Sequence, residues 1–353
     1  MIDVLIAGGG PIGLAAGIEA RKAGMDVVVV EPRRGPVDKA CGEGLMPGAV
    51  GALERLGVNP DGHDLKGISY QSRGLRVDHS FRHGAGRGVR RTVLHAALAE
   101  HAADVGVETV HQRVVAVRQN ADAVTARLTD GTRVRSAWLL GCDGLHSQVR
   151  DLVELGTNTR EAKERGTARR GQRRFGLNRH FALPPWSDFV EVHWTQTAEL
   201  YVTPVSANEV GVAVLGPRHT NYVDALRMVP ALAERLEHAE SSTSVLGAGP
   251  LRQPTRARVA QRVLLVGDAS GYVDAITGEG IRVGLAQARA AIGCIIAGEP
   301  ARYEHEWRKA TRDYRILTSG LVALGASPLR RFIVPAASSL PGVYGAIVER
   351  LSR

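Results

Sequence analysis

The amino-acid sequence predicts an α/β protein in which a doubly wound, Rossmann-like βαβ domain carries an inserted antiparallel β-sheet domain and ends in helices. Three observations lead to this prediction. Residues 2–31 read as strand, glycine turn, helix and strand; short β-rich runs fill residues 175–250; and a second strand–glycine–helix segment spans residues 262–297. A chain of 353 residues, 44% of them hydrophobic, is long enough to bury the core that this architecture needs.

The first segment, DVLIAGGGPIGLAAGIEARKAGMDVVVVEP, contains an apolar strand, a helix and a second apolar strand that ends at Glu31. Its glycines satisfy the pattern G-x-G-x-x-G, which lets a backbone turn tightly and approach a pyrophosphate at a helix N-terminus. A carboxylate at the end of the second strand accepts hydrogen bonds from ribose hydroxyls. The segment therefore predicts dinucleotide binding by Gly8, Gly10, Pro11, Gly13 and Glu31.

A second glycine-rich loop follows the apolar run VLLVG. Asp268 is expected at the carboxyl end of that strand, where open α/β sheets bind ligands. Gly278, Gly280 and Ile281 begin a helix whose N-terminus offers free N–H groups and the positive end of the helix dipole. FAD is long enough to engage both loops, with its ADP half at the first and its ribityl chain and isoalloxazine at the second. The two loops together predict FAD.

The remaining patterns divide the chain into a discontinuous cofactor domain and a substrate domain. Helices are expected at residues 47–56 and 92–105, and strands near 107–117 and 123–129. The predicted FAD-binding domain comprises residues 1–70, 88–155 and 255–300, the substrate domain comprises residues 71–87 and 156–254, and residues 301–353 form a C-terminal helical segment.

Cysteine usage and hydropathy indicate the cellular compartment. Cys41, Cys142 and Cys294 are odd in number and form no CxxC pair, which argues against a disulfide framework and against a metal site. The N-terminus runs straight into a strand, and no apolar run approaches the roughly 18 residues that suggest a membrane span. A cytoplasmic protein without a transmembrane segment is expected.

The net charge of +9 is concentrated in one segment. Residues 160–179 hold eight Lys or Arg residues against Glu161 and Glu164. Because no aromatic interleaving or nucleic-acid motif accompanies this charge, a nucleic-acid partner is not expected. A solvated insertion beside the active site is favoured, and contact with an acidic carrier protein or an anionic membrane surface is left open.

Three motifs, in this order along the chain, resemble the FAD-dependent monooxygenase and geranylgeranyl reductase superfamily, whose fold is similar to that of aromatic hydroxylases. They are the glycine pattern at residues 8–13, CDGLHSQVR at residues 142–150, and GDA at residues 267–269 with TGEGI at residues 277–281. The resemblance covers nearly the whole chain. It is specific for FAD and unspecific for substrate, and it implies NAD(P)H as a transient reductant.

The resemblance also implies roles for individual residues at the cofactor. Asp143 and Gly144 would lie near the pyrophosphate, and Asp268 would hold the ribityl chain. The N–H groups of Gly280 and Ile281 would face the pyrimidine edge of the flavin. These assignments extend the predicted cofactor site from the first loop to the second.

Two further positions and two departures complete the cofactor assignment. Arg91 is similar to the arginine that these proteins direct to the cofactor, and Val115 to the strand position whose backbone often meets adenine. Monooxygenases usually carry a histidine after Gly-Asp-Ala and a proline before the glycine loop, whereas this chain has Ser270 and Ala275.

The loop KACGEGLMP, residues 39–47, is similar to a sequence seen in geranylgeranyl reductase-like members. Cys41 and Glu43 are the predicted catalytic residues, because a thiol and a carboxylate beside a flavin can supply the proton that accompanies hydride delivery to a double bond. In the alternative interpretation, Cys41 packs as a small hydrophobe and Glu43 pairs with Lys39 or Arg34.

The run ELYVTPVS places Tyr201 on the antiparallel sheet that forms the substrate roof in this superfamily. Tyr201 is therefore a candidate substrate contact, although any sheet face has this appearance. The Trp-x-Trp-x-Ile-Pro motif that flavin-dependent halogenases share does not occur in the sequence, so halogenation is not favoured.

These observations favour an FAD-dependent oxidoreductase. The favoured reaction is an NAD(P)H-driven monooxygenation, hydroxylating or epoxidising a small hydrophobic or aromatic substrate of secondary metabolism, either free or tethered to a carrier. One alternative is reduction of an isoprenoid-like C=C bond with Cys41 or Glu43 as the proton source. A non-catalytic flavin-binding protein is a third possibility, which the intact motif at residues 142–150 opposes. Substrate identity, the choice of NADH or NADPH, and the oligomeric state are left open.

Overall fold

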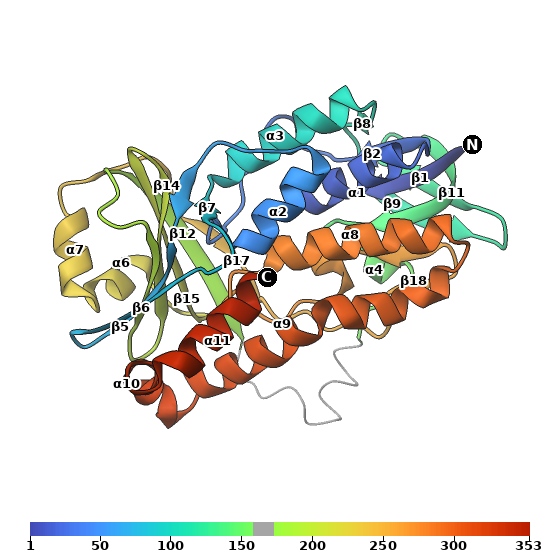
Figure 1. The fold of residues 1–353 in the computed structure, drawn as a ribbon. Coiled ribbons are helices and arrows are strands. Elements are labelled where there is room, and N and C mark those ends of the chain that lie inside the picture. The colour runs from blue at the N-terminus through green and yellow to red at the C-terminus, as the bar shows by residue number, and fades with distance from the viewer. Residues whose placement is uncertain (158–172) are drawn as a thin grey trace.

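The computed structural model describes residues 1–157 and 173–353. Of the basic segment predicted at residues 160–179, everything up to residue 172 lies outside the described residues. Figure 1 shows two sheets side by side, one near the N-terminus under a layer of helices and one at the opposite end, with the C-terminal helices running along both.

The first sheet has the parallel core that the βαβ pattern predicts, in the order β18-β19-β11-β1-β2-β8. These strands are β1 (Ile2–Ala7), β2 (Val27–Val30), β8 (Glu108–Val110), β11 (Arg133–Gly141), β18 (Val259–Ala260) and β19 (Val263–Leu265). The antiparallel strands β9 (Val114–Gln119) and β10 (Val124–Leu128) extend it from β11. Because β1 and β2 are covered on both faces, they are almost wholly apolar in sequence.

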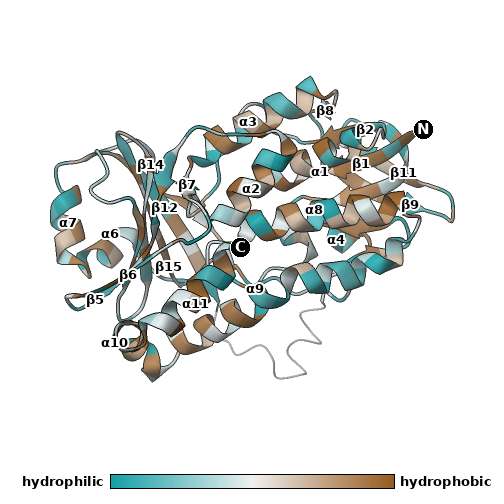
Figure 2. Cartoon of the chain, in the orientation of Figure 1, coloured by the Kyte–Doolittle hydropathy of each residue, from teal (hydrophilic) through white to brown (hydrophobic). Residues whose placement is uncertain are grey.

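Side chains of β1 alternate between two hydrophobic cores. Val4 and Ile6 pack against helices, whereas Leu5 and Ala7 pack against the layer formed by β9 and β10. The helices of this face are α1 (Pro11–Lys22), α2 (Pro47–Leu56), α3 (Arg91–Asp104) and α8 (Gly280–Ile296). Figure 2 shows the hydrophobic residues on these strands and on parts of the helices that cover them.

The second sheet is largely antiparallel, in the order β16-β12-β15-β14-β13-β5-β6. Its strands are β5 (Gly67–Ser72), β6 (Leu75–Ser80), β12 (Arg174–Ala182), β13 (Phe189–Trp194), β14 (Glu199–Ser206), β15 (Glu209–Pro217) and β16 (Glu240–Ser241), with β17 (Leu246–Ala248) paired to β12. Since β5 pairs with β13 along its length, the domain boundary predicted after residue 70 falls inside β5, and the second sheet begins at Gly67.

One face of the second sheet packs on two short helices, α6 (Tyr222–Arg227) and α7 (Pro230–Leu236). Leu200 and Val202 of β14 point to that face, so the intervening Tyr201 points to the opposite face, toward the first domain. A small sheet of β3 (Gly44–Leu45), β7 (Gly86–Gly88) and β4 (His63–Leu65) packs against β14 of the second sheet and against α2.

The chain ends in helices, as predicted for residues 301–353. They are α9 (Tyr303–Gly325), α10 (Ile333–Ser339) and α11 (Pro341–Ser352), with the short 3-10 turns η2 (Pro300–Arg302) and η3 (Pro328–Phe332). No single helix of the described chain is long and apolar enough to cross a membrane, but the helical pair 328–339 and 341–352, bent by 101°, passes that test when its two parts are taken together.

Candidate active site

A cavity of about 530 Å³ lies between the two sheets and is lined by both glycine loops. Most of the residues predicted from the sequence meet there: Gly8, Gly10, Pro11, Glu31, Cys41, Glu43, Arg91, Asp143, Gly144, Tyr201, Asp268, Gly278, Gly280 and Ile281. Two do not line it. Gly13 lies behind the first loop, and on β9 the lining residue is Val114, the neighbour of Val115.

The three glycines of the first loop have different physical roles. Gly8 has a φ of +104°, which side-chain-bearing residues rarely adopt. A Cβ atom on Gly13 would lie 1.8 Å from the carbonyl oxygen of Gly8, so glycine is needed for α1 to approach β1. A Cβ atom built on Gly10 would have an Arg91 nitrogen, 3.9 Å away, as its nearest neighbour, so there is room for a ligand at the N-terminus of α1.

Glu31 lies at the end of β2, beside this loop. Its Oε2 accepts a hydrogen bond of 2.9 Å from the N–H of Gly9, and its Oε1 lies 2.7 Å from the Arg33 guanidinium. Burial raises the pKa of Glu31, but the hydrogen bonds and charge of Arg33 outweigh burial and hold this pKa below its ordinary value. Glu31 is therefore an ionised acceptor, as recognition of ribose hydroxyls requires.

Two buried polar atoms of residues that line the cavity lack a hydrogen-bond partner among the described residues. Asp143 Oδ2 accepts a 3.0 Å hydrogen bond from the N–H of Val149, but Asp143 Oδ1 accepts none from the described residues. Arg91, the first residue of α3, likewise leaves its Nε unpaired within the described chain. Buried polar groups in native proteins are almost always hydrogen-bonded, so these atoms fit a polar ligand such as the pyrophosphate and ribose of FAD.

The second loop is a short 3-10 turn, η1 (Gly267–Ser270), that directly follows β19. Burial raises the pKa of Asp268, while the charges of Lys39 and Arg91 counteract that shift. The predicted turn at Gly278 has a φ of +70°, and α8 begins two residues later at Gly280. The carboxylate and the helix N-terminus thus lie at one cavity wall, where the ribityl chain and the flavin edge are expected.

Ser270, which stands where related monooxygenases have histidine, belongs to the packing behind this wall. Its hydroxyl donates to the Gly267 carbonyl at 2.7 Å and accepts a 2.8 Å hydrogen bond from the Trp307 indole N–H of α9. Gln287 of α8 accepts a 2.7 Å bond from the N–H of Gly267. The side chain at position 270 therefore fixes the turn and does not line the cavity.

Cys41 lines the cavity on a loop that the second sheet holds in place. Asn178 of β12 donates to the Cys41 carbonyl at 3.3 Å, and Thr203 of β14 donates to the Gly42 carbonyl at 2.8 Å. Burial raises the pKa of the Cys41 thiol, with the Arg91 charge opposing. The thiol is therefore protonated at neutral pH and is a possible proton donor rather than a nucleophile.

Glu43 is held by three groups from two domains. Its Oε1 accepts a 2.7 Å hydrogen bond from the backbone N–H of Arg91 and lies 3.7 Å from Arg90 Nε, and its Oε2 lies 2.5 Å from His180 Nε2. Sequence reasoning offered Lys39 or Arg34 as partners and missed His180, since 137 residues separate it from Glu43. Through these contacts the Glu43 carboxylate links the start of α3 to β12. The catalytic role predicted for Glu43 stays a prediction.

The far end of the cavity is apolar. Its wall includes Ile68, Tyr70, Val190, Val192, Leu215, Leu251, Val348 and Leu351. Tyr201 lies between this wall and the second loop, and its hydroxyl donates a 2.9 Å hydrogen bond to the Ile276 carbonyl. Burial raises the pKa of Tyr201 well above its ordinary value, so it is a neutral phenol. This end suits a hydrophobic substrate.

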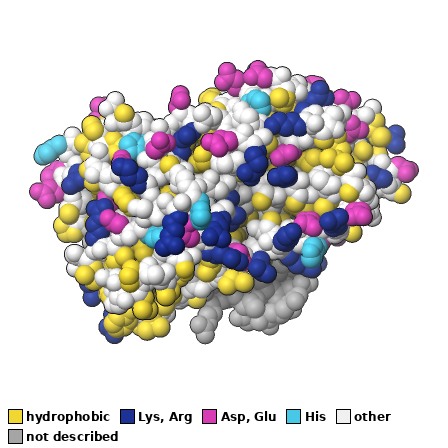
Figure 3. Space-filling view, in the orientation of Figure 1, with side chains coloured by type: hydrophobic (Ala, Val, Ile, Leu, Met, Phe, Trp, Pro, Cys, Tyr) yellow, Lys and Arg dark blue, Asp and Glu magenta, His cyan; other side chains and the backbone are white. Residues whose placement is uncertain are grey.

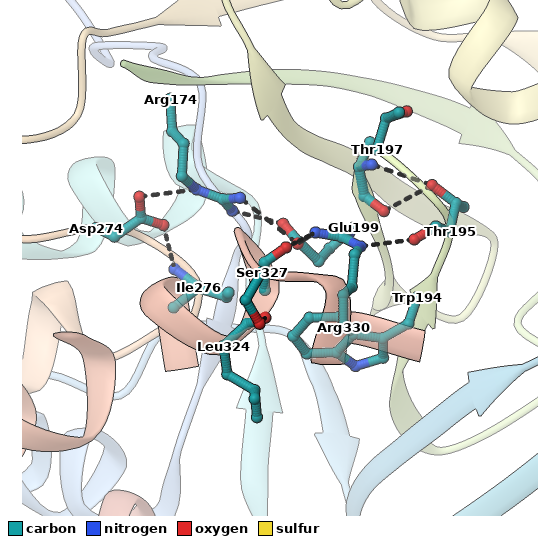
Figure 4. A network of polar contacts seen from close by, with 12 residues as sticks. Arg174, Trp194, Thr195, Thr197, Glu199, Asp274, Ile276, Leu324, Ser327 and Arg330 are labelled. Atoms are coloured by element: carbon teal, nitrogen blue, oxygen red, sulfur yellow. Dashed lines mark hydrogen bonds and ion pairs between the residues drawn. The ribbon is translucent and has the colours of Figure 1, made fainter. Parts of the chain in front are cut away.

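A buried charge network beside the cavity joins the second sheet, the second loop and the C-terminal segment (Figure 4). Arg174 of β12 lies 2.5 Å from Glu199 of β14 and 3.0 Å from Asp274 of the loop that precedes α8. Arg330 of η3 lies 2.6 Å from the other oxygen of Glu199. Two cations thus balance two carboxylates, and the network fixes the loop that leads to Gly278.

A glycine loop with an ionised ribose acid, a second loop at the carboxyl end of a parallel strand, and an apolar chamber under an antiparallel sheet define the class of two-domain flavin-dependent oxidoreductases. The chain matches the FAD binding domain family over residues 1–298 and belongs to that family. It is an FAD-dependent enzyme of the monooxygenase and reductase type, and the residues that line the cavity fit FAD.

Individual relatives show both reaction types. The chain is 36% identical over 163 residues to a rifampicin monooxygenase of Rhodococcus hoagii, a match covering 43% of this chain and 33% of that protein. It is 29% identical over 343 residues to a menaquinone reductase of Mycolicibacterium smegmatis, covering 88% and 80%. A flavoprotein/dehydrogenase from Cytophaga hutchinsonii has the same fold, with a TM-score of 0.85, 16% identity and coverage of 99% and 92%.

Proposed function

We propose that this chain is an NAD(P)H-driven FAD monooxygenase that hydroxylates or epoxidises a small hydrophobic or aromatic substrate. The observation that carries the proposal is the single cavity in which the flavin-edge loop meets an apolar chamber. Bound FAD takes the reducing equivalents of NAD(P)H and supplies the oxygen chemistry. One atom of O₂ enters the substrate and the other leaves as water.

The chain's own residues would bind, orient and exclude water. Gly8, Gly10, Glu31 and Arg91 would hold the cofactor at the end where the first loop, the ribose acid and the start of α3 converge. The aliphatic wall at the other end would keep water from the reacting centre. Exclusion of water suppresses side reactions that consume reducing equivalents without forming product. The neutral Tyr201, tied to the second loop, would position the substrate against the flavin.

Positively charged side chains at the cofactor end of the cavity would favour anionic ligands. Arg33, Lys39 and Arg113 line its cofactor end, so an anionic group of the cofactor, of NAD(P)H or of a carrier-tethered substrate meets positive charge there. The proposal includes a cytoplasmic location, which the three free cysteines favour.

The test follows the oxygen atom. The FAD-loaded protein is incubated with NADPH or NADH, naphthol as an aromatic probe and isotopically labelled O₂, and the product is analysed by mass spectrometry. The proposal expects probe-stimulated O₂ uptake and one labelled oxygen atom in the product. O₂ uptake that no aromatic probe stimulates, together with a product that gains two hydrogens and no label, would overturn it.

A second candidate is reduction of a C=C bond in an isoprenoid-like substrate. The protonated Cys41 thiol in the cavity wall favours it, and so does a match over 88% of the chain, at 26% identity, to a digeranylgeranylglycerophospholipid reductase of Methanosarcina acetivorans. In this reaction a hydride would reach one carbon and Cys41 would donate a proton to the other.

Two alanine variants separate the candidates. The NADPH-dependent, anaerobic gain of two hydrogens in the isoprenoid chain of menaquinone, followed by mass spectrometry, is compared in Cys41→Ala and in Cys294→Ala. The Cys294 thiol is buried on α8 outside the cavity lining. Reduction with Cys41 as acid predicts a loss of roughly 100-fold in the first variant alone. Equal rates in the two variants would remove Cys41 as the proton donor. Absence of any anaerobic turnover would leave monooxygenation as the only supported reaction.

A further inference from the structure

The C-terminal helices expose an unusual concentration of large apolar side chains. Among the described residues, six of the fourteen large hydrophobic residues that are exposed lie between residues 316 and 347: Ile316, Leu329, Phe332, Leu340, Val343 and Ile347. Figure 3 shows hydrophobic side chains gathered at the end of the molecule where Figure 1 labels α10. A concentration of exposed apolar side chains of this kind is typical of an interaction site.

The charge of this element is one-sided. No Asp or Glu occurs in the sequence between Asp313 and Glu349, whereas the exposed Arg315 and Arg331 do. Arg331 is exposed, and its guanidinium carbon lies 4.8 Å from the ring centre of the neighbouring exposed Phe332. An apolar surface that carries arginine and no carboxylate is complementary to the headgroups and acyl chains of an anionic lipid layer.

The same helices are anchored in the protein by their other face. Ile333 and Val334 of α10 and Tyr344 and Val348 of α11 are buried, and the Tyr344 hydroxyl donates a 3.1 Å hydrogen bond to the Ile68 carbonyl of β5. Insertion of α10 and α11 across a bilayer would break these contacts. The bent helical pair is therefore arranged to lie on a lipid surface with its exposed face down.

The apolar surface is continuous with the cavity. Ile347 is 41% exposed and also lines the cavity, and Val348 and Leu351 of the same helix line its wall. A hydrophobic molecule dissolved in a lipid layer under α11 would thus have a path of apolar side chains to the flavin site. An aqueous route would require transfer of that molecule into water first.

From these observations we propose that the face formed by Ile316, Leu329, Arg331, Phe332, Leu340, Val343 and Ile347 docks the protein on the surface of an anionic phospholipid bilayer. The bilayer would present hydrophobic substrate at α11. The docking concerns the whole folded chain and does not depend on whether the reaction is an oxygenation or a reduction.

The test is flotation of the FAD-saturated full chain with phosphatidylcholine vesicles that contain or lack phosphatidylglycerol. The wild type is expected to float with the anionic vesicles and to be released by high salt, since part of the attraction is electrostatic. Phe332→Ser combined with Leu340→Ser should weaken binding about tenfold or more. Arg331→Glu should weaken binding to the anionic vesicles and leave the weaker binding to neutral vesicles unchanged.

The matched control is Val223→Ser combined with Met228→Ser, which removes two apolar side chains, each 48% exposed, from α6 and its C-cap on the second domain. It should float like the wild type. Failure of the wild type to float, or equal loss in both double variants, would overturn the proposal. So would a wild-type dimer, seen by sedimentation, that Phe332→Ser with Leu340→Ser dissociates while vesicle binding is absent, because the face would then join two copies of the chain.

Discussion

The two ends of the cavity are built in different ways. At the cofactor end, the ligand-facing residues come mostly from turns that directly follow strands. These turns are held by contacts within their own strand–turn–helix units, as with Glu31 and Gly9, 22 residues apart, or Asp143 and Val149, six residues apart. At the substrate end, the wall is assembled from β5, β13, β14, β15 and α11, which are far apart along the chain. The first end is fixed by local backbone geometry, whereas the second depends on long-range packing.

This difference explains what the sequence predicts. The βαβ unit and FAD follow from spacing and turn chemistry, because a glycine pattern and its strand–helix context determine the local geometry. Most of the residues predicted for the cofactor line the cavity, and their contacts with FAD stay a prediction. The contact between Glu43 and His180, the four-residue charge network around Arg174, and the place of β5 in the second sheet did not follow. Each of these joins segments whose pairing only the folded topology creates, and no short motif encodes it.

The largest expected effect concerns the long-range network. Arg174→Met removes the partner of Asp274, whose side chain is only 3% exposed, and should lower the free energy of unfolding by about 3–5 kcal/mol, because it leaves a buried charge uncompensated. Urea denaturation at pH 7 measures it. The control Arg227→Met breaks an exposed pair with Asp224 and should cost no more than about 1 kcal/mol. Equal losses would show that the network does not hold the domains together.

The backbone geometry at the cofactor end can be tested by adding one methyl group to the first glycine loop. Gly13→Ala forces α1 away from β1 and should weaken FAD binding about 10–100-fold, since overpacking costs about 1–3 kcal/mol. Gly293→Ala makes the same change on α8, where a Cβ would meet nothing within 4 Å, and should leave FAD affinity unchanged. FAD titration followed by flavin fluorescence gives both values, and an unchanged affinity in Gly13→Ala would contradict the geometry described for the first loop.

Glu279 is the N-cap of α8, and its raised pKa should make the free energy of unfolding depend on pH. Burial raises its pKa from 4.5 to about 7 against the opposing charge of Arg282. Between these values the folded state binds more protons than the unfolded state, so the free energy of unfolding falls as pH rises through this window. The loss should amount to about 1–3 kcal/mol by pH 8.

Urea denaturation between pH 5 and pH 8 measures this slope. Glu279→Gln should remove that part of the slope and gain stability relative to the wild type at pH 8, whereas Glu299→Gln, which removes an exposed carboxylate, should not. The same slope in Glu279→Gln as in the wild type would assign the pH dependence to another group.

The smallest expected effect separates substrate binding from stability. Tyr201→Phe and Tyr222→Phe each remove one hydroxyl that donates to a backbone carbonyl, on opposite faces of the second sheet. Each should cost about 0.5–1.5 kcal/mol of stability. Only Tyr201→Phe should alter the KM for an aromatic probe, by roughly two- to tenfold, with FAD affinity unchanged. Equal KM values in both variants would remove Tyr201 from the substrate contacts.

The central claim is that FAD and an apolar substrate occupy opposite ends of one cavity, and a titration of the FAD-loaded protein with naphthol, monitored by flavin absorbance, tests it most directly. The wild type should show a saturable perturbation of the flavin spectrum. Ala213→Phe, which adds a ring at the apolar end, should bind FAD as the wild type does and respond to naphthol about tenfold more weakly or not at all. Displacement of FAD by naphthol, or an unchanged response in Ala213→Phe, would contradict the shared cavity.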